Sequence, residues 1–221
     1  ETLSIFSEYA KSKNYDAAYT PWMELRNRNP KFNKAVFVYG ERILDSKIKN
    51  AADEEKIVFI NDLLKLWKER SEVFPNITPQ GSYLAKASQL QYNNRELLNK
   101  SDEELYAAFD TAYTSDPKTF TNPKSLYTYF SLMVDLYDAS SKTAQELFNK
   151  YDDISEKVDF EVKNYTNKRN AFLDEEGEVK ELDRKDASRL KSYNSYLNAY
   201  DQIAGSIDTK LGSRANCENL I

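Results

Sequence analysis

The most constraining feature of this sequence is a spacing that occurs three times. In each copy a large aromatic residue lies eight positions before a proline: Trp22 and Pro30, Trp67 and Pro75, Phe109 and Pro117. The aromatic residues are 45 and 42 positions apart. Internal repetition with a period of this size is typical of arrays of helix pairs, in which each pair stacks on the next. The spacing therefore predicts an all-α solenoid, a kind of fold that offers an extended surface for binding other macromolecules.

The distribution of apolar residues also favours helices. The chain contains only five glycines and six prolines, few for a fold that needs many special turns. Apolar residues recur every three or four positions, and this spacing places them on one face of a helix. We interpret each such apolar stripe as the face of a helix that packs in the protein core. The alternative is a coiled-coil seam between two chains. The longest stripe is formed by Leu190, Tyr193, Leu197, Tyr200, Ala204, Ile207 and Leu211.

Proline, glycine and capping residues divide the chain into nine predicted helices without a strand. Asn122-Pro123 is typical of a helix start, Ser101-x-x-Glu104 of a capping box, and Asp174–Gly177 of a turn. Three hairpins would occupy residues 1–121, and a helix pair with a C-terminal capping helix would occupy 122–221, as one continuous domain. The predicted helices span 2–12, 15–28, 33–48, 53–73, 79–98, 102–115, 123–138, 142–172 and 183–211.

The first predicted hairpin resembles a tetratricopeptide repeat. The run Asn14-Tyr-Asp-Ala-Ala-Tyr19, followed by Trp22, Leu25 and Pro30, looks like the second helix of that repeat. The resemblance implies that Tyr9 packs in the first helix, that Ala18 allows close approach and that Trp22 fills the space between helices. It implies the same packing role for Trp67 and Phe109. The later units have leucine at the position of Ala18 and longer periods, so the array is a divergent one.

The composition, rich in Tyr, Asn and Lys, is similar in style to exported repeat proteins of the Bacteroidota. That resemblance implies the periplasm or the cell envelope rather than the cytoplasm. The ending Cys217–Ile221 also resembles the opening Glu1–Ile5. One hypothesis is therefore that the chain is a fragment and that Cys217 pairs with a cysteine just before Glu1 in the intact protein. The alternative is a free cysteine near a frayed terminus.

The charge balance disfavours two classes of partner. The formal net charge is −5 and the isoelectric point is about 5.1. Nucleic acids and anionic membrane surfaces are bound by clustered Lys and Arg, so neither is an expected partner. No stretch is long and apolar enough to predict insertion into a membrane.

Catalysis has little support in the sequence, and we predict a protein that is not an enzyme. The chain has no histidine, the commonest general base, and a single cysteine, so we expect no metal site and no cofactor. Paired carboxylates of the kind used in glycoside hydrolysis remain. Adjacent helical residues point about 100° apart, so we interpret these pairs as solvated charge. They are Glu103-Glu104, Asp152-Asp153 and Glu175-Glu176.

Tyrosine is the over-represented residue, with 16 copies. Five tyrosines lie in predicted first helices of the later pairs, which in a helical array tend to line the concave face. Tyrosine suits contact surfaces because it combines apolar area with a hydroxyl group. The sequence thus predicts a non-catalytic scaffold or adaptor that binds a partner polypeptide in a tyrosine-rich groove, with a carbohydrate-binding protein as the alternative. The five are Tyr83, Tyr92, Tyr127, Tyr129 and Tyr137.

Overall fold

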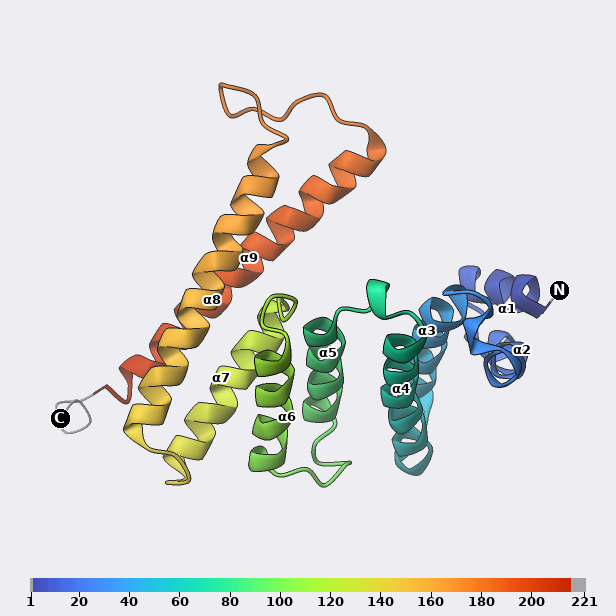
Figure 1. Cartoon of the computed structure of the whole chain (residues 1–221), viewed down its shortest axis with the longest axis horizontal. Coiled ribbons are helices and arrows are strands. Elements are labelled where there is room, and N and C mark those ends of the chain that lie inside the picture. The colour runs from blue at the N-terminus through green and yellow to red at the C-terminus, as the bar shows by residue number, and fades with distance from the viewer. Residues whose placement is uncertain (1, 216–221) are drawn as a thin grey trace. The chain divides into compact units, whose positions relative to one another are not determined.

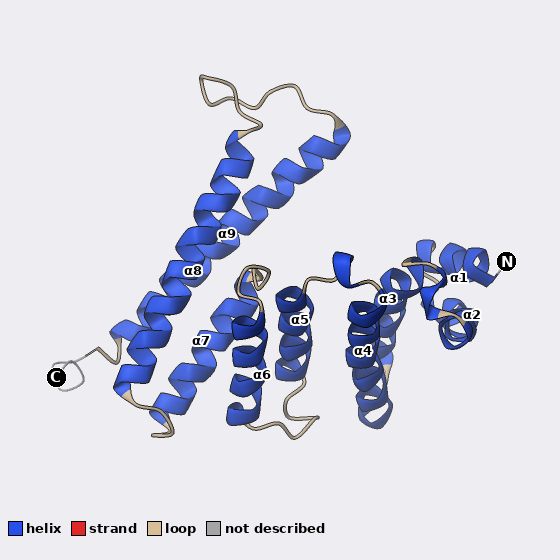
Figure 2. Cartoon of the chain, viewed as in Figure 1, coloured by secondary structure: helices blue, strands red, loops and turns tan. Residues whose placement is uncertain are grey.

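A computed structural model shows the fold of residues 2–215, so Cys217 and its hypothetical disulfide lie outside the described residues (Figure 1). Residues 2–215 form nine α-helices and two short 3₁₀ helices, and their only β-type pairing is a single bridge between Leu173 and Val179 (Figure 2). The predicted all-α class is confirmed for this range. The elements are α1 (Thr2–Lys11), α2 (Tyr15–Arg28), η1 (Pro30–Phe32), α3 (Ala35–Asn50), α4 (Asp53–Val73), η2 (Pro75–Ile77), α5 (Gln80–Asn93), α6 (Asp102–Ser115), α7 (Pro123–Asp138), α8 (Ala144–Asn170) and α9 (Arg184–Gly212).

The helices α2, α7, α8 and α9 each start next to a residue whose side chain accepts a hydrogen bond from a backbone N–H group of the first turn. Asn122 accepts a hydrogen bond from the N–H of Ser125 (3.1 Å), and Pro123 is the first residue of α7, as predicted. At the start of α8, Thr143 and Glu146 form a reciprocal capping box that the sequence analysis did not identify. Both caps fix the helix start through contacts between residues less than four positions apart. A short stretch of sequence is therefore enough to predict such a boundary.

The predicted end of α5 is wrong. The helix expected over 79–98 ends at Asn93, and turns follow as far as Asn99, whose φ of 50° is in the left-handed region. Asn94 donates its side-chain amide to the carbonyl of Leu90 (2.8 Å). Such short side chains compete with the helical backbone for its hydrogen bonds, and this outweighs the apolar pattern that continues beyond.

The helices belong to two compact units. Unit 1 comprises Glu1–Ser101 and Ala112–Thr119, and unit 2 comprises Asp102–Thr111 and Phe120–Ile221. Helix α6 is therefore divided between them. Both tryptophans belong to unit 1, whereas nine of the sixteen tyrosines belong to unit 2.

In unit 1 each of the helices α1 to α4 packs on the next one in the chain, and α1 also contacts α3. Trp22 of α2 is fully buried and its indole N–H donates to the carbonyl of Val36 (2.7 Å) in α3. A Cβ atom at Gly40 would lie 2.5 Å from a carbon of the Trp22 ring, closer than any real contact. Gly40 is thus the small residue that lets α2 and α3 approach.

The other residues expected to pack in unit 1 differ in their environments. Ala18 is fully buried, and Trp67 is 7% exposed. The prediction for Tyr9 is wrong, because its side chain is 40% exposed. Phe6 and Ala10 fill the core instead, since they lie one turn apart on the same face of α1, and Tyr9 lies about 100° away from Ala10.

A buried ionic contact joins α2 to α4 in unit 1. Arg26 is 5% exposed, and its guanidinium binds Asp62 (2.7 Å) and Glu69 (2.9 Å). The same guanidinium lies 5.2 Å from the centre of the Trp22 ring. Two carboxylates and an aromatic face together offset the cost of removing this cation from water.

Unit 2 is built around α7, which contacts both α8 and α9. Most α7 side chains are buried, so this helix is covered on nearly all sides. Phe109 is fully buried and lies against the rings of Phe120 and Tyr129, at 6.5 and 6.2 Å between centres. Tyr200 of α9 is also fully buried, and its hydroxyl donates to the carbonyl of Thr121.

Residues 171–183, called here the connection, join α8 to α9. The turn predicted at Asp174–Gly177 is confirmed. Asp174 accepts hydrogen bonds from the N–H groups of Glu176 (3.1 Å) and Glu178 (2.8 Å). Gly177 has a φ of 84°, a conformation that favours glycine.

Candidate functional site

The five tyrosines expected to line a groove are divided between the two units. Tyr83 and Tyr92 lie on α5 in unit 1, whereas Tyr127, Tyr129 and Tyr137 lie on α7 in unit 2. Four of them are half-buried and Tyr129 is fully buried. The prediction that Tyr129 contacts a partner is therefore wrong. We expected α7 to have an exposed face, but α8 and α9 pack against this helix and the Tyr129 side chain is buried.

Tyr129 instead belongs to a polar network inside unit 2. Its hydroxyl donates to the Asp110 carboxylate and accepts from the Lys150 Nζ atom (2.7 Å). Lys150 also lies 3.4 Å from the carboxylate of Asp153. Burial and the bond to Asp110 raise the pKa of Tyr129, and burial raises the pKa of Tyr106 to about 12. Both phenols stay protonated near neutral pH, which makes them hydrogen-bond donors and not general bases.

The tyrosines of α5 are covered by their neighbours. The guanidinium of Arg95 lies 4.6 Å from the centre of the Tyr92 ring, and its Nη1 atom donates to the Tyr92 carbonyl (3.2 Å). Tyr83 packs against the hydrophobic core of unit 1. Both tyrosines are half-buried, and each ring already has a packing partner in unit 1.

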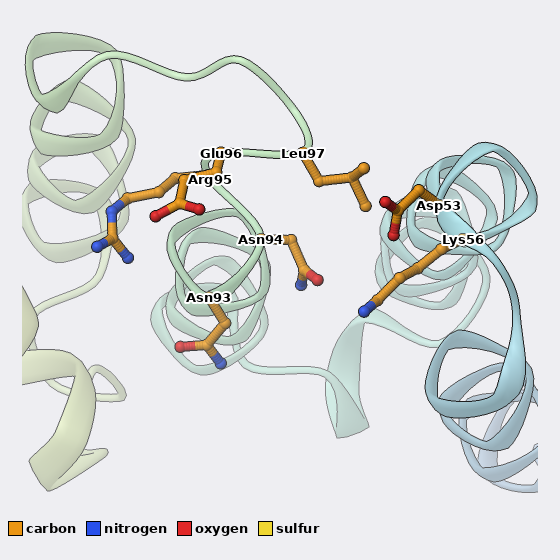
Figure 3. A pocket seen from close by; sticks show the side chains of 7 residues that line it. All are labelled: Asp53, Lys56, Asn93, Asn94, Arg95, Glu96 and Leu97. Carbon is orange, nitrogen blue, oxygen red and sulfur yellow. The ribbon is translucent and has the colours of Figure 1, made fainter.

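The end of α5 nevertheless forms a concave site, because the helix stops at Asn93. We call this site the α5 pocket. It has a volume of about 520 Å³ and lies between the start of α4 and the turns after α5 (Figure 3). The residues that line it are Asp53 and Lys56 of α4 together with Asn93, Asn94, Arg95, Glu96 and Leu97.

Several polar groups in the α5 pocket have capacity for further hydrogen bonds. Asn93 accepts from Gln89 (3.0 Å) through its side-chain oxygen, which leaves its NH₂ group available. Asn94 uses its NH₂ group on the Leu90 carbonyl, which leaves its oxygen available. Lys56 extends toward Asn94, whereas Arg95 points away from Lys56 (Figure 3).

The charged groups of the pocket are also uncompensated. Among residues 2–215, neither Asp53 nor Lys56 has an ion-pair partner within 4.0 Å or a side-chain hydrogen bond. Lys56 is half-buried, whereas Asp53 is exposed. One wall of the pocket therefore supplies a cation and an anion, and the other supplies an amide donor and an amide acceptor.

No reactive grouping accompanies these polar side chains. In the part of the chain that the structure describes, no three Asp, Glu or Cys residues come together as possible metal ligands. None of the carboxylate pairs noted in the sequence lines the pocket: Glu175 and Glu176 lie in the exposed connection, and Asp153 binds Lys150. The α5 pocket thus has the chemistry of a polar binding site.

Sequence reasoning missed this pocket because it treated residues 79–98 as one helix. The signal that could have revealed it is the pair Asn93-Asn94 followed five residues later by Asn99. Asparagine is favoured at helix ends and tolerates positive φ, so three copies in seven residues indicate a helix stop. A helix stop exposes a loop, and loops often carry binding residues.

Comparison with protein-family models, with curated protein sequences and with solved structures finds no match to this chain. None of the helices among residues 2–215 is both long enough and apolar enough to cross a membrane. What the protein binds therefore has to be inferred from the chemistry of its own residues.

Proposed function

We propose that this protein is a non-catalytic scaffold or adaptor, a divergent tetratricopeptide-like helical array that binds a segment of a partner polypeptide. The α5 pocket, rather than the five tyrosines, is the contact site in this proposal. The observation that carries it is the set of uncommitted groups on Asp53, Lys56, Asn93 and Asn94 around one concave space.

A peptide segment matches these groups chemically. An extended backbone presents N–H donors and C=O acceptors, and an asparagine side chain offers one group of each kind. The NH₂ group of Asn93 and the oxygen of Asn94 therefore complement a peptide unit. Asp53 and Lys56 add charges that select among the side chains next to that unit.

The packing of unit 1 supports the array. Hairpin α1–α2 is followed by hairpin α3–α4, with α2 packed on α3 and α4 packed on α5. This order is what consecutive stacked hairpins require. Carbohydrate binding through tyrosine has less support, because the five tyrosines are buried or half-buried.

The test uses the full chain and an array of short peptides of random sequence. The double variant Lys56→Ala/Asn94→Ala should bind the selected peptides about tenfold or more weakly, because each lost hydrogen bond contributes about 1 kcal/mol and tenfold corresponds to about 1.4 kcal/mol. The matched control is Lys68→Ala/Asn61→Ala, which removes the same residue types from exposed positions of α4.

Equal binding by both double variants would remove the α5 pocket from the proposal. If the peptide array gives no binding, and oligosaccharides bind the parent chain but not the Lys56→Ala/Asn94→Ala variant, carbohydrate binding replaces polypeptide binding.

A further inference from the structure

A second surface of the molecule lies in unit 2, where the hairpin of α8 and α9 extends past α7 (Figure 1). The half of the hairpin near the start of α8 and the end of α9 contacts α7: Tyr151 lies 6.1 Å from Phe130, and Lys210 lies 5.8 Å from Tyr127. We call the other half, residues 160–197 with the connection, the arm.

The two helices of the arm are joined by one aromatic seam. Tyr165 of α8 stacks on Tyr196 of α9 at 4.7 Å and lies 5.9 Å from Tyr193. Phe172 continues the seam, 6.1 Å from Tyr193. Because these contacts use only the facing sides of α8 and α9, the outer faces of the arm remain available for a partner.

One outer face holds an apolar groove of about 370 Å³, which we call the tip groove. The hydrogen bond from the Lys180 N–H to the Phe172 carbonyl (3.0 Å) folds the connection back on its own start, next to the end of α8. Val179 is 57% exposed, so its apolar side chain is accessible at the groove. The apolar lining is Val179, Leu182, Ala187 and Leu190, and the polar lining is Lys180, Lys191 and Asn194.

The connection beside this groove is acidic. It contains six acidic residues and one lysine, Lys180, which gives it a formal charge of −5. Basic residues flank it in the chain, with Arg169 before it and Arg184 and Lys185 after it. The tip groove is therefore next to a short segment of concentrated negative charge.

Most of these acidic side chains are available to a partner. Asp174 is used by the turn, and Asp183 caps α9 by accepting from the Asp186 N–H (2.8 Å). The other four are exposed, and none has an ion-pair partner or a side-chain hydrogen bond among the described residues. They are Glu175, Glu176, Glu178 and Glu181.

We propose that the tip groove docks a basic, apolar segment of a partner polypeptide. An aliphatic side chain of the partner occupies the space between Val179 and Leu190, and Lys or Arg residues on either side of it face the four glutamates. Opposite charge steers such a segment to the arm, and apolar contact retains it. A second copy of this chain does not fit, because it presents the same acidic connection. This inference does not depend on the α5 pocket.

The probe is a short peptide of alternating lysine and leucine, acetylated and amidated, titrated into the full isotope-labelled chain and followed by NMR. At about 10 mM salt, where the screening length is about 30 Å, the shifts should map to Val179, Leu182 and Leu190. The variant E175Q/E176Q/E178Q/E181Q should raise the Kd about tenfold. Val179→Ser should raise the Kd about threefold without changing the charge.

The matched control is E8Q/E24Q/E54Q/E72Q, which neutralises four exposed glutamates of unit 1. Less than a twofold change in this control supports the proposal. Equal losses in both quadruple variants, or equal binding of a peptide with glutamate in place of lysine, overturn it. Shifts at Val179 and Leu190 that depend on protein concentration without peptide would also overturn it, because a second copy would then be the occupant.

Discussion

Units 1 and 2 both pack helices against their neighbours, but they differ in the large aromatic residues that fill their cores. In unit 1, Trp22 is inserted against a glycine of the next helix, and its only polar atom is satisfied by the Val36 carbonyl. In unit 2, buried tyrosines carry hydroxyl groups that need partners, and Asp110, Lys150 and a backbone carbonyl supply them. The core around Trp22 in unit 1 therefore depends on shape, and the core around Tyr129 and Tyr200 in unit 2 depends on polar complementarity.

The difference predicts how each unit responds to substitution. A core that depends on shape is sensitive to added or removed volume. A core that depends on buried hydroxyl groups is sensitive to the loss of a single atom and to pH. The four experiments that follow test this contrast.

The largest effect is expected for Trp22→Ala. Removing a fully buried tryptophan should lower the free energy of unfolding by about 3–5 kcal/mol, because it loses apolar burial and leaves a cavity. Hydrogen exchange should show the loss of protection in α1 to α4. Equal loss of protection in α8 and α9 would contradict the view that the Trp22 contacts belong to unit 1 alone.

Gly40→Ala should lower the free energy of unfolding by about 1–3 kcal/mol, although alanine normally stabilises a helix. The added Cβ meets three atoms of the Trp22 ring at 2.5–2.8 Å. Gly205→Ala in α9 is the matched control, since nothing lies within 4 Å of a Cβ at that position. Chemical denaturation of both variants measures the effect. A stabilised Gly40→Ala protein would show that the close approach is not needed.

Tyr129→Phe tests the polar core of unit 2. We expect a loss of about 1–2 kcal/mol, because Lys150 and Asp110 each lose a hydrogen-bond partner while the ring contacts remain. The control is Tyr196→Phe, whose hydroxyl makes no side-chain hydrogen bond among the described residues and whose ring is 37% exposed. If both variants lose equal stability in denaturant titrations, the network is not what stabilises unit 2.

The smallest effect at neutral pH is that of tyrosine ionisation, which appears only in alkali. Burial raises the pKa values of Tyr106 and Tyr165 to about 12, above the ordinary value near 10. A raised pKa in the folded state stabilises the fold fully below pH 10, and this contribution is lost as the pH rises through about 12. Absorbance of tyrosinate near 295 nm should therefore rise in two stages, the later one accompanied by unfolding of unit 2. A single stage near pH 10 with the fold intact would contradict the raised values.

Most of the helix pattern could be predicted from the sequence because helix signals are local. The stripe from Leu190 to Leu211 lies in α9, and Asn122-Pro123 starts α7 as expected. The end of α5 was missed because the apolar pattern continues past Asn93, whereas the helix stops there and Asn94 bonds the Leu90 carbonyl through its side chain. The site was missed for the same reason.

The packing partners could not be predicted from spacing alone. The aromatic–proline repeat identifies Trp22 as a packing residue, but it does not indicate Gly40, which lies 18 residues later on another helix. Likewise, the sequence alone does not show that α8 and α9 cover α7, so it does not show which tyrosines of α7 are buried. Burial is a property of the assembled unit, so a tyrosine that packs and a tyrosine that binds look alike in sequence.

The fit between Trp22 and Gly40 also restricts how this protein can change over generations. A side chain larger than that of glycine does not fit at position 40 while tryptophan occupies position 22, so substitutions at these two positions depend on each other. A selection that randomises codon 40 alone should return glycine almost every time. When codons 22 and 40 are randomised together, survivors should include pairs with a smaller residue at 22 and a larger one at 40.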